Sequence, residues 1–282
     1  MVGPGPFQQI FRAKRHKSAG AFFYEPIVIN WHQTYAAIWR RRQQALRPVK
    51  ELDPITLDEL LGIEQQKQAL VANTRRFLAG LPANNALLWG ARGSGKSSLL
   101  KALLNAFKDE GLRIVEIDKD DLSALPDIVD DLREQAHPFI LFCDDLSFEA
   151  GDSLYKPLKS VLEGSIEPPP VNVLFYATSN RRHLMPEYMR ENLETQMVGA
   201  EVHYADSLEE KISLADRFGL RLAFYPPQTE TYLAIVDSFF PDYAGDREEL
   251  HKQALAFAHQ QAAKNGRAAK QFYQSLVIGG AE

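Results

Sequence analysis

The sequence predicts an α/β fold, with a parallel five-stranded sheet covered by helices on both faces and a small helical domain after it. The first observation is that short apolar runs alternate with segments of helical periodicity between residues 53 and 227. The second is a glycine-rich turn that joins one apolar run directly to a helix. The third is the tail from residue 228 onward, which shows helical patterns and no further strand. Strands that alternate with helices are typical of a parallel sheet, because each parallel connection needs a crossover.

The composition is that of a globular protein. The chain has 282 residues and is 45% apolar, which is enough for a substantial core. A net charge of −5 argues against a general polyanion binder. The single cysteine, Cys143, excludes an intrachain disulfide and a cysteine-based zinc cluster. No apolar stretch has the form of a signal peptide or reaches the roughly 18 residues of a membrane helix, so we expect a cytoplasmic protein with no membrane insertion.

We expect three parts along the chain. Residues 1–52 form an N-terminal extension or linker with two basic clusters, at residues 12–17 and 40–47. Aromatic side chains between the clusters would suit stacking on nucleic-acid bases, but they fit equally an extension that packs on the core and leaves its basic side chains in water. At a net charge of −5 we favour the second interpretation. Residues 53–227 form the α/β domain, and residues 228–282 form the small helical domain.

The elements of the α/β domain follow from local patterns. Its first helix is expected over residues 61–81, where apolar residues recur on one face. Thr56 and Glu59 have the spacing of a capping box, in which the glutamate reaches back to the capping residue. The five strands are expected at residues 86–89, 112–117, 139–143, 171–178 and 221–225. After a Pro-Pro pair, the helices of the tail are expected at residues 229–240, 246–265 and 267–277.

The glycine-rich turn "GARGSGKS" follows the strand at 86–89 and opens a helix. It matches the pattern G-x-x-x-x-G-K-[ST] of a phosphate-binding loop in the strand–turn–helix context that this pattern requires, which disfavours a chance turn. Glycines let successive N–H groups turn toward phosphate oxygens, and the helix N-terminus adds partial positive charge. Lys96 would reach the β- and γ-phosphates, and the Ser97 hydroxyl would bind Mg²⁺. The predicted nucleotide contacts are Gly90, Ala91, Arg92, Gly93, Ser94, Gly95, Lys96, Ser97 and Ser98.

The apolar strand "FILFC" ends in two acidic residues, Asp144 and Asp145. Carboxylates at the carboxyl end of a parallel strand lie at the edge of the sheet where ligands bind. We expect Asp144 to hold Mg²⁺ and Asp145 to polarise the attacking water, with Glu149 as a second candidate for that task. The alternative is an acidic pair that only ends a strand and caps a helix, which the nearby phosphate-binding loop disfavours. Cys143 is expected to be a small buried apolar residue.

A further apolar strand, "LFYATSN", delivers Ser179 and Asn180 at its carboxyl end. Together with the loop, the acidic strand and the helical tail, it makes residues 53–280 resemble an AAA+ ATPase. "FILFCDDLSFE" and "YATSNRRHLMPE" are similar to a bacterial AAA+ family catalogued only as a domain of unknown function, and "DDLSF" resembles the replication initiator and helicase-loader branch. The resemblance implies that Asn180 is the sensor 1 residue, which orients the lytic water, and that the small helical domain is a lid.

Two arginines take roles from the same resemblance. Arg217, in "LADRFGL", resembles the arginine finger that points to the γ-phosphate bound by a neighbouring subunit. The alternative is a surface arginine paired with Asp216 or Glu210. Arg267, in "NGRAAKQF", resembles sensor 2, the lid arginine that reports the γ-phosphate to the helical domain. The alternative for Arg267 is an exposed arginine at the start of a helix.

The resemblance also implies ligands, activity and partners. The segment "LLGIEQQK" is similar to the one that packs on adenine in AAA+ proteins, so Gly62 and Ile63 are expected to contact the base unless they only lead into a core helix. ATP and Mg²⁺ are the expected ligands, with Ser97 and Asp144 as the metal ligands. We expect an ATP-hydrolysing homo-oligomer, a switch or remodeller that acts on a macromolecular client, either protein or nucleic acid.

Three alternatives come from other classes of protein. A GTP switch would need the guanine-reading motif Asn-Lys-x-Asp, which the sequence lacks. A small-molecule kinase would need a substrate-binding lid rich in arginine, whereas the helical tail carries one well-placed arginine. A module that binds ATP and hydrolyses it negligibly is compatible with Asp145, a shorter carboxylate than the glutamate of many related ATPases.

Overall fold

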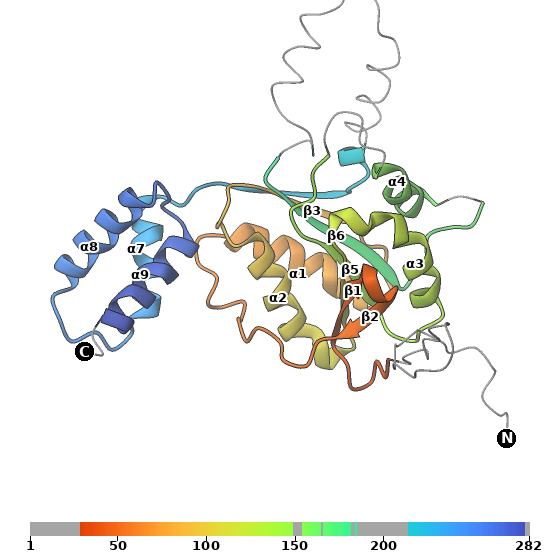
Figure 1. Cartoon of the computed structure of the whole chain (residues 1–282), viewed down its shortest axis with the longest axis horizontal. Helices are drawn as coiled ribbons and strands as arrows, with labels where there is room; N and C mark the ends of the chain where they lie inside the picture. Colours follow the sequence, from red (N-terminus) through yellow and green to blue (C-terminus); the bar gives the residue numbers. More distant parts are fainter. Residues whose placement is uncertain (1–28, 149–153, 165, 182–183, 185–213, 280–282) are drawn as a thin grey trace, which may run out of the picture.

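A computed structural model describes residues 29–148, 154–164, 166–181, 184 and 214–279. In these residues a seven-stranded sheet lies between two layers of helices, and three further helices form a lobe at one side (Figure 1). The predicted α/β fold with a mostly parallel sheet is confirmed. Among the described helices, none combines the length and the apolar character that crossing a membrane requires.

Five parallel strands form the centre of the sheet, in the order β4-β5-β6-β3-β7. They are β3 (Ala86–Gly90), β4 (Arg113–Glu116), β5 (Phe139–Cys143), β6 (Val173–Ser179) and β7 (Leu220–Phe224). Each overlaps one of the five predicted strands, which are confirmed. Because helices cover both faces, the strands are apolar along most of their length, and Cys143 is fully buried as expected.

The predicted number of five strands is wrong, because two more strands precede the first helix. β1 (Ala36–Arg40) pairs in parallel with β4, and β2 (Ala45–Pro48) pairs antiparallel with β1 at the edge of the sheet. Both lie within the segment predicted to be an N-terminal extension. The apolar run of β1 leads directly into three arginines, so the pattern resembles a basic cluster, and β2 has only two buried residues.

Two helices cover each face of the sheet. They are α1 (Glu64–Leu78), α2 (Lys96–Phe107), α3 (Leu125–Arg133) and α4 (Tyr155–Glu163), and short 3-10 turns lie at Arg41–Gln43, Lys108–Glu110 and Lys119–Ala124. α1 and α2 share an apolar core with Leu88, whereas α3 and α4 share another with Leu87. Neighbouring residues of one strand therefore belong to separate cores, as the alternation of side chains along a strand requires.

The helix predicted at residues 61–81 begins later than expected, at Glu64. Glu59 Oε2 accepts hydrogen bonds from the N–H of Thr56 at 2.6 Å and from its hydroxyl at 2.9 Å, which is the reach-back contact of a capping box. The chain nevertheless makes a turn at this point. Gly62, with a φ of +76°, has a left-handed conformation that no helix contains, so the helix begins only after it.

The lobe beside the sheet consists of α7 (Thr229–Phe239), α8 (Arg247–Gln260) and α9 (Gly266–Gly279), and we refer to it as the lid. Its core is separate from the two cores of the sheet and includes the buried side chains of Tyr232 and Phe272. The predicted helical character of the tail is confirmed.

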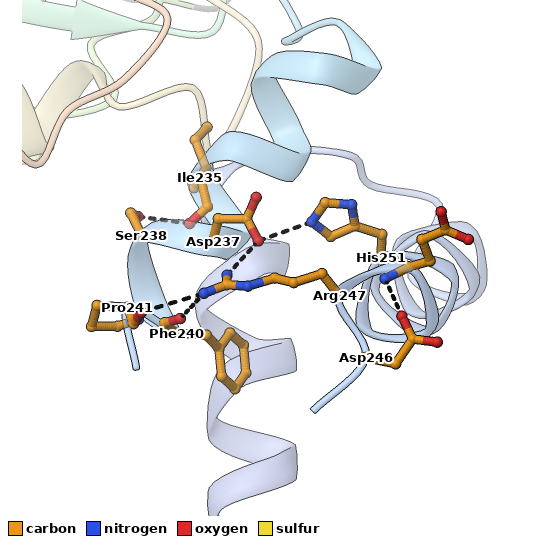
Figure 2. Close-up of polar contacts among 9 residues, drawn as sticks. Ile235, Asp237, Ser238, Phe240, Pro241, Asp246, Arg247 and His251 are labelled. Carbon is orange, nitrogen blue, oxygen red and sulfur yellow. Dashed lines mark hydrogen bonds and ion pairs between the residues drawn. The ribbon is translucent and has the colours of Figure 1, made fainter. Parts of the chain in front are cut away.

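An ion cluster joins α7 to α8 (Figure 2). Asp237 Oδ1 lies 2.8 Å from Arg247 Nη1 and 2.9 Å from His251 Nε2. Arg247 also donates to the carbonyl oxygen of Phe240 at 2.9 Å. Partial burial acts to raise the pKa of Asp237, but the hydrogen bonds from His251 and Arg247 outweigh it and hold the pKa below its usual value. The native cluster therefore favours the ionised carboxylate.

We expect Asp237→Asn to lower the melting temperature by about 1–3 °C at pH 7, since ion pairs this exposed contribute up to ~1 kcal/mol. A carboxyl with a lowered pKa stabilises the native state above its ordinary value of 3.8 and loses this effect as pH falls through the native pKa. The difference should therefore persist from pH 7 to about pH 4 and shrink below it, as scanning calorimetry can measure. Glu249→Gln on α8 is the control, and a difference that vanishes already above pH 5 would contradict the assignment.

Candidate nucleotide-binding site

The phosphate-binding loop connects the end of β3 to the start of α2. Gly90 has a φ of +129°, and a Cβ on it would lie 2.0 Å from the carbonyl oxygen of Phe224 in β7. The next residue, Ala91, donates its N–H to that same oxygen at 2.9 Å. No residue with a side chain fits this close approach, so Gly90 fixes the point at which the loop leaves the sheet.

Lys96, the first residue of α2, is only 7% exposed. Its Nζ donates to the carbonyl oxygens of Gly90 at 2.9 Å and Ala91 at 2.7 Å, and to Asn180 Oδ1 at 3.1 Å. Burial lowers the pKa of Lys96, and the carboxylates of the nearby acidic pair offset part of that effect. Lys96 thus joins the loop to the carboxyl end of β6.

The acidic pair after β5 meets the end of β6. Asp144 Oδ1 accepts a hydrogen bond from Ser97 Oγ at 2.6 Å and another from the hydroxyl of Thr178. Thr178 Oγ1 in turn accepts the N–H of Asp145 at 2.9 Å. Asn180 Nδ2 donates to Asp145 Oδ1 at 2.6 Å. The structure therefore brings together four predicted site residues and one that was not predicted.

Thr178 is the site residue that the sequence analysis missed. The residue is 1% exposed, and its hydroxyl links Asp144 to the backbone of Asp145. Asp145 has a φ of +52°, which is uncommon for a residue with a side chain, and its hydrogen bond to Thr178 holds it there. The sequence did contain a signal, because Thr178 and Asn180 are two residues apart and leave β6 on the same face.

Ser97 and Asp144 suit a magnesium ion. Mg²⁺ prefers oxygen ligands, usually one or two carboxylates together with water and substrate phosphates. No group of three or more His, Cys, Asp or Glu that could hold a metal occurs within the described part of the chain. A third carboxylate, Glu116 at the end of β4, lies nearby, and partial burial raises its pKa, as does the charge of Asp144.

The segment before α1 lies between the loop and the lid. A Cβ on Gly62 would be 2.3 Å from Thr231 Cγ2 of α7, so the backbone packs directly on the lid. Ile63 is buried, and its Cδ1 lies 3.5 Å from the position that a Cβ on Gly95 would take. Gly62 and Ile63 thus lie beside the phosphate-binding loop. Their contact with adenine stays a prediction.

The other predicted residues of the loop lie along its turn. Ser94 Oγ donates to the carbonyl oxygen of Ala91 at 2.7 Å, and the carbonyl oxygen of Arg92 accepts a hydrogen bond from the lid. Ser98 lies in the first turn of α2. Arg267, in the first turn of α9, is exposed, and its charge adds to the lowering of the Lys96 pKa that burial causes. Arg267 is therefore close enough to the loop to act on it electrostatically.

Arg217 is not drawn into this network. Its Nε lies 2.5 Å from Glu163 Oε1 at the end of α4. The alternative partner Asp216 instead binds Arg221 at 2.7 Å. Glu210, the other alternative partner, and Glu149, the second candidate base, lie outside the described residues.

Fold and site together define the class of the protein. The phosphate-binding loop follows β3, which lies between β6 and β7, the acidic pair follows β5 two places along the sheet, and a helical lid lies beside the loop. This is the arrangement of an AAA+ P-loop protein, and the resemblance seen in the sequence is confirmed. The chain belongs to the family described as "Protein of unknown function (DUF815)", whose family model matches residues 32–279.

A comparison with curated proteins finds no match. Solved structures of Thermotoga maritima RuvB are similar in fold. The structure described as the RuvB Holliday junction branch migration motor has 16% identity and a TM-score of 0.45, and the match covers 79% of this chain and 72% of that chain. The match to one RuvB mutant has 16% identity and a TM-score of 0.46 and covers the same shares of the two chains. The match to another mutant has 17% identity and a TM-score of 0.44 and covers 80% of this chain and 74% of that chain.

We expect Thr178→Val to destabilise the protein by about 1–3 kcal/mol, because it preserves the shape of the side chain and removes both hydrogen bonds of a buried hydroxyl. Thr178→Ser keeps the hydroxyl and should stay close to the wild type. Denaturant unfolding of the three proteins without nucleotide measures the difference. A Thr178→Val variant as stable as the wild type would show that the hydroxyl does not organise the acidic pair.

Proposed function

We propose that the protein binds ATP with Mg²⁺ and hydrolyses it to ADP and phosphate. The observation that carries this proposal is the hydrogen-bonded chain from Lys96 through Asn180 to Asp145, at 3.1 and 2.6 Å, beside the contact of Ser97 with Asp144. A phosphate-binding cation, an orienting amide and a carboxylate base are the groups that hydrolysis of a phosphoanhydride uses.

Phosphate binding would use the loop and the N-terminus of α2. The N–H groups of the loop and the partial positive charge of the helix end favour an anion there. The ammonium of Lys96 now donates to the carbonyl oxygens of Gly90 and Ala91, and the same hydrogens can turn to the β- and γ-phosphates. Mg²⁺, held by Ser97 and Asp144, would neutralise part of the charge on the phosphates when bound.

Asp145 is the proposed general base. Its Oδ1 accepts the hydrogen bond from Asn180, whereas its Oδ2 accepts none from the residues that the structure describes. Oδ2 can therefore take the proton of the attacking water, while Asn180 keeps the carboxylate in a fixed orientation. The hydrogen bond from the Asp145 N–H to Thr178 holds the backbone in place during this step.

Hydrolysis is favoured over ATP binding alone by one contact. A module that only holds ATP needs no group to orient Asp145, yet Asn180 Nδ2 lies 2.6 Å from its carboxylate. ATP is proposed rather than GTP because the sequence lacks the guanine-reading motif. The expected boundary at residue 53 is not kept, because β1 and β2 place part of residues 1–52 in the sheet of the α/β domain. We further propose that the α/β domain ends near residue 227 and that residues 228–282 act as a nucleotide-sensing lid.

We also propose a homo-oligomer in which Arg217 serves the neighbouring subunit. Within its own chain Arg217 binds Glu163 at 2.5 Å and makes no described contact with the phosphate-binding loop. A guanidinium that is always charged suits the charge that develops on a γ-phosphate in the transition state. Arg217 would exchange Glu163 for that phosphate at an interface, and the assembly would act on a macromolecular client.

We expect Lys96→Ala to weaken ATP binding about 10- to 100-fold, because it removes hydrogen bonds from a charged donor. Asp145→Asn should bind ATP normally and hydrolyse it about 10²- to 10⁴-fold more slowly, as expected when a base is lost. Titration with a fluorescent ATP analogue and phosphate release measure the two effects. Lys101→Ala, on the same helix and paired with Asp53 at 3.0 Å, is the control.

If the Lys96→Ala variant binds ATP with the affinity of the wild type, the loop does not bind the phosphates of ATP. If Glu149→Gln stops turnover and Asp145→Asn does not, the base is Glu149.

We expect Arg217→Ala to bind ATP as the wild type does and to hydrolyse it about 10³-fold or more slowly. Mixing it with Lys96→Ala should restore part of the activity, because mixed interfaces pair an intact finger with an intact loop. The control is Arg221→Ala, which changes an arginine of β7 that pairs with Asp216 and should keep wild-type activity. A monomeric enzyme whose specific activity does not depend on protein concentration would contradict the proposed assembly.

A further inference from the structure

The lid reaches the phosphate-binding loop through Asn265, the residue before α9. Its Nδ2 donates to the carbonyl oxygen of Arg92 at 3.0 Å. Its Oδ1 accepts the N–H of Ala268 in the first turn of α9, also at 3.0 Å. One partner is an acceptor and the other a donor, so the two contacts fix which end of the amide is which. The same side chain caps a lid helix and holds the loop.

Gly93 is the residue of the loop that makes this contact sterically feasible. A Cβ on Gly93 would lie 2.7 Å from both Cγ and Nδ2 of Asn265, closer than real side-chain atoms approach. Gly266, which follows Asn265, also packs on the loop, because a Cβ there would lie 3.5 Å from the carbonyl oxygen of Gly93. The start of α9 thus rests directly on the loop backbone, and Gly93 has a packing role beyond its φ of +71°.

The hydrogen bond fixes a peptide plane of the loop. The carbonyl of Arg92 and the N–H of Gly93 belong to one peptide group, and the described chain contains no cis peptide bond. In a trans peptide these two groups point in opposite directions. When Asn265 holds the carbonyl, the N–H of Gly93 is directed away from the lid. N–H groups of such a loop are the donors that bind phosphate.

We propose that Asn265 is a positioning residue that orients the Arg92–Gly93 peptide for phosphate and couples the seating of the lid to nucleotide binding. This inference rests on the proposed binding of ATP. A seated lid orients one backbone N–H of the loop for phosphate binding. By reciprocity, a bound nucleotide stabilises the seated lid by the same free energy. Asparagine is required because aspartate and serine can cap the helix but cannot donate to the Arg92 carbonyl at this distance.

The test is Asn265→Ser, which keeps a good helix cap and removes the donor to the loop. We expect the affinity for ATP to fall about three- to tenfold, the effect of one neutral hydrogen bond. Turnover at saturating ATP should stay unchanged, because Asn265 does not touch the reacting atoms. Hydrogen exchange without nucleotide should become faster in the loop, whereas the first turn of α9 stays capped.

The matched control is Asp246→Ser. Asp246 caps α8 in the same lid by accepting the N–H of Glu248 at 2.8 Å (Figure 2). Its described contacts do not include the loop. This variant should keep the affinity of the wild type and its exchange rate in the loop.

Wild-type affinity or unchanged exchange in the loop of Asn265→Ser would overturn the inference. An equal loss of affinity in Asp246→Ser would also overturn it, because a general weakening of the lid would then explain both. If the wild type itself fails to bind ATP, the proposed function fails. Faster loop exchange in nucleotide-free Asn265→Ser alone would then still support the contact between lid and loop.

Discussion

The register of three parallel strands brings the site together. Cys143 of β5 lies opposite Ala177 of β6, so the residues that follow them, Asp144 and Thr178, meet beyond the paired segment. On the other side of β6, Ser179 lies opposite Trp89 of β3. The next residues along, Asn180 and Gly90, both contact the ammonium of Lys96. A slip of one residue in either pair would turn these polar groups toward the opposite core, so burial on both faces keeps the register fixed.

The parts of the fold and site that the sequence predicted are encoded locally. The phosphate-binding loop is recognisable because its glycines, Lys96 and Ser97 are contiguous between a strand and a helix. The central strands are recognisable because a sheet covered on both faces requires continuous apolar runs. Asp144, Asp145 and Asn180 could be placed at one edge because the carboxyl ends of parallel strands meet there. Each of these inferences needs only neighbouring residues and the alternation of strands with helices.

What the sequence could not supply depends on contacts between distant residues. The alternation along β6 could place Thr178 on the face of Asn180, but it could not identify Asp144, 34 positions away, as its partner. Asn265 and Arg92 are 173 positions apart and form no local pattern. The partner of Arg217 is Glu163, whereas sequence reasoning offered only its neighbours in the chain. The hairpin of β1 and β2 was missed because its arginine-rich turn has the pattern of a basic cluster. β1 is recognisable as a strand only when β4 is known to lie beside it.

The outermost strands of the sheet limit how the chain can associate with others. At the β7 edge, the outward carbonyl oxygen of Ala223 already accepts a hydrogen bond from Gln66 Nε2 at 2.7 Å. At the opposite edge, the N–H of Val49 bonds inward to β1, so one of the nitrogens on the outer side is that of Pro48, which has no hydrogen to donate. A strand from another molecule would find a blocked acceptor at one edge and a missing donor at the other, which disfavours intermolecular sheet extension and the aggregation that it seeds.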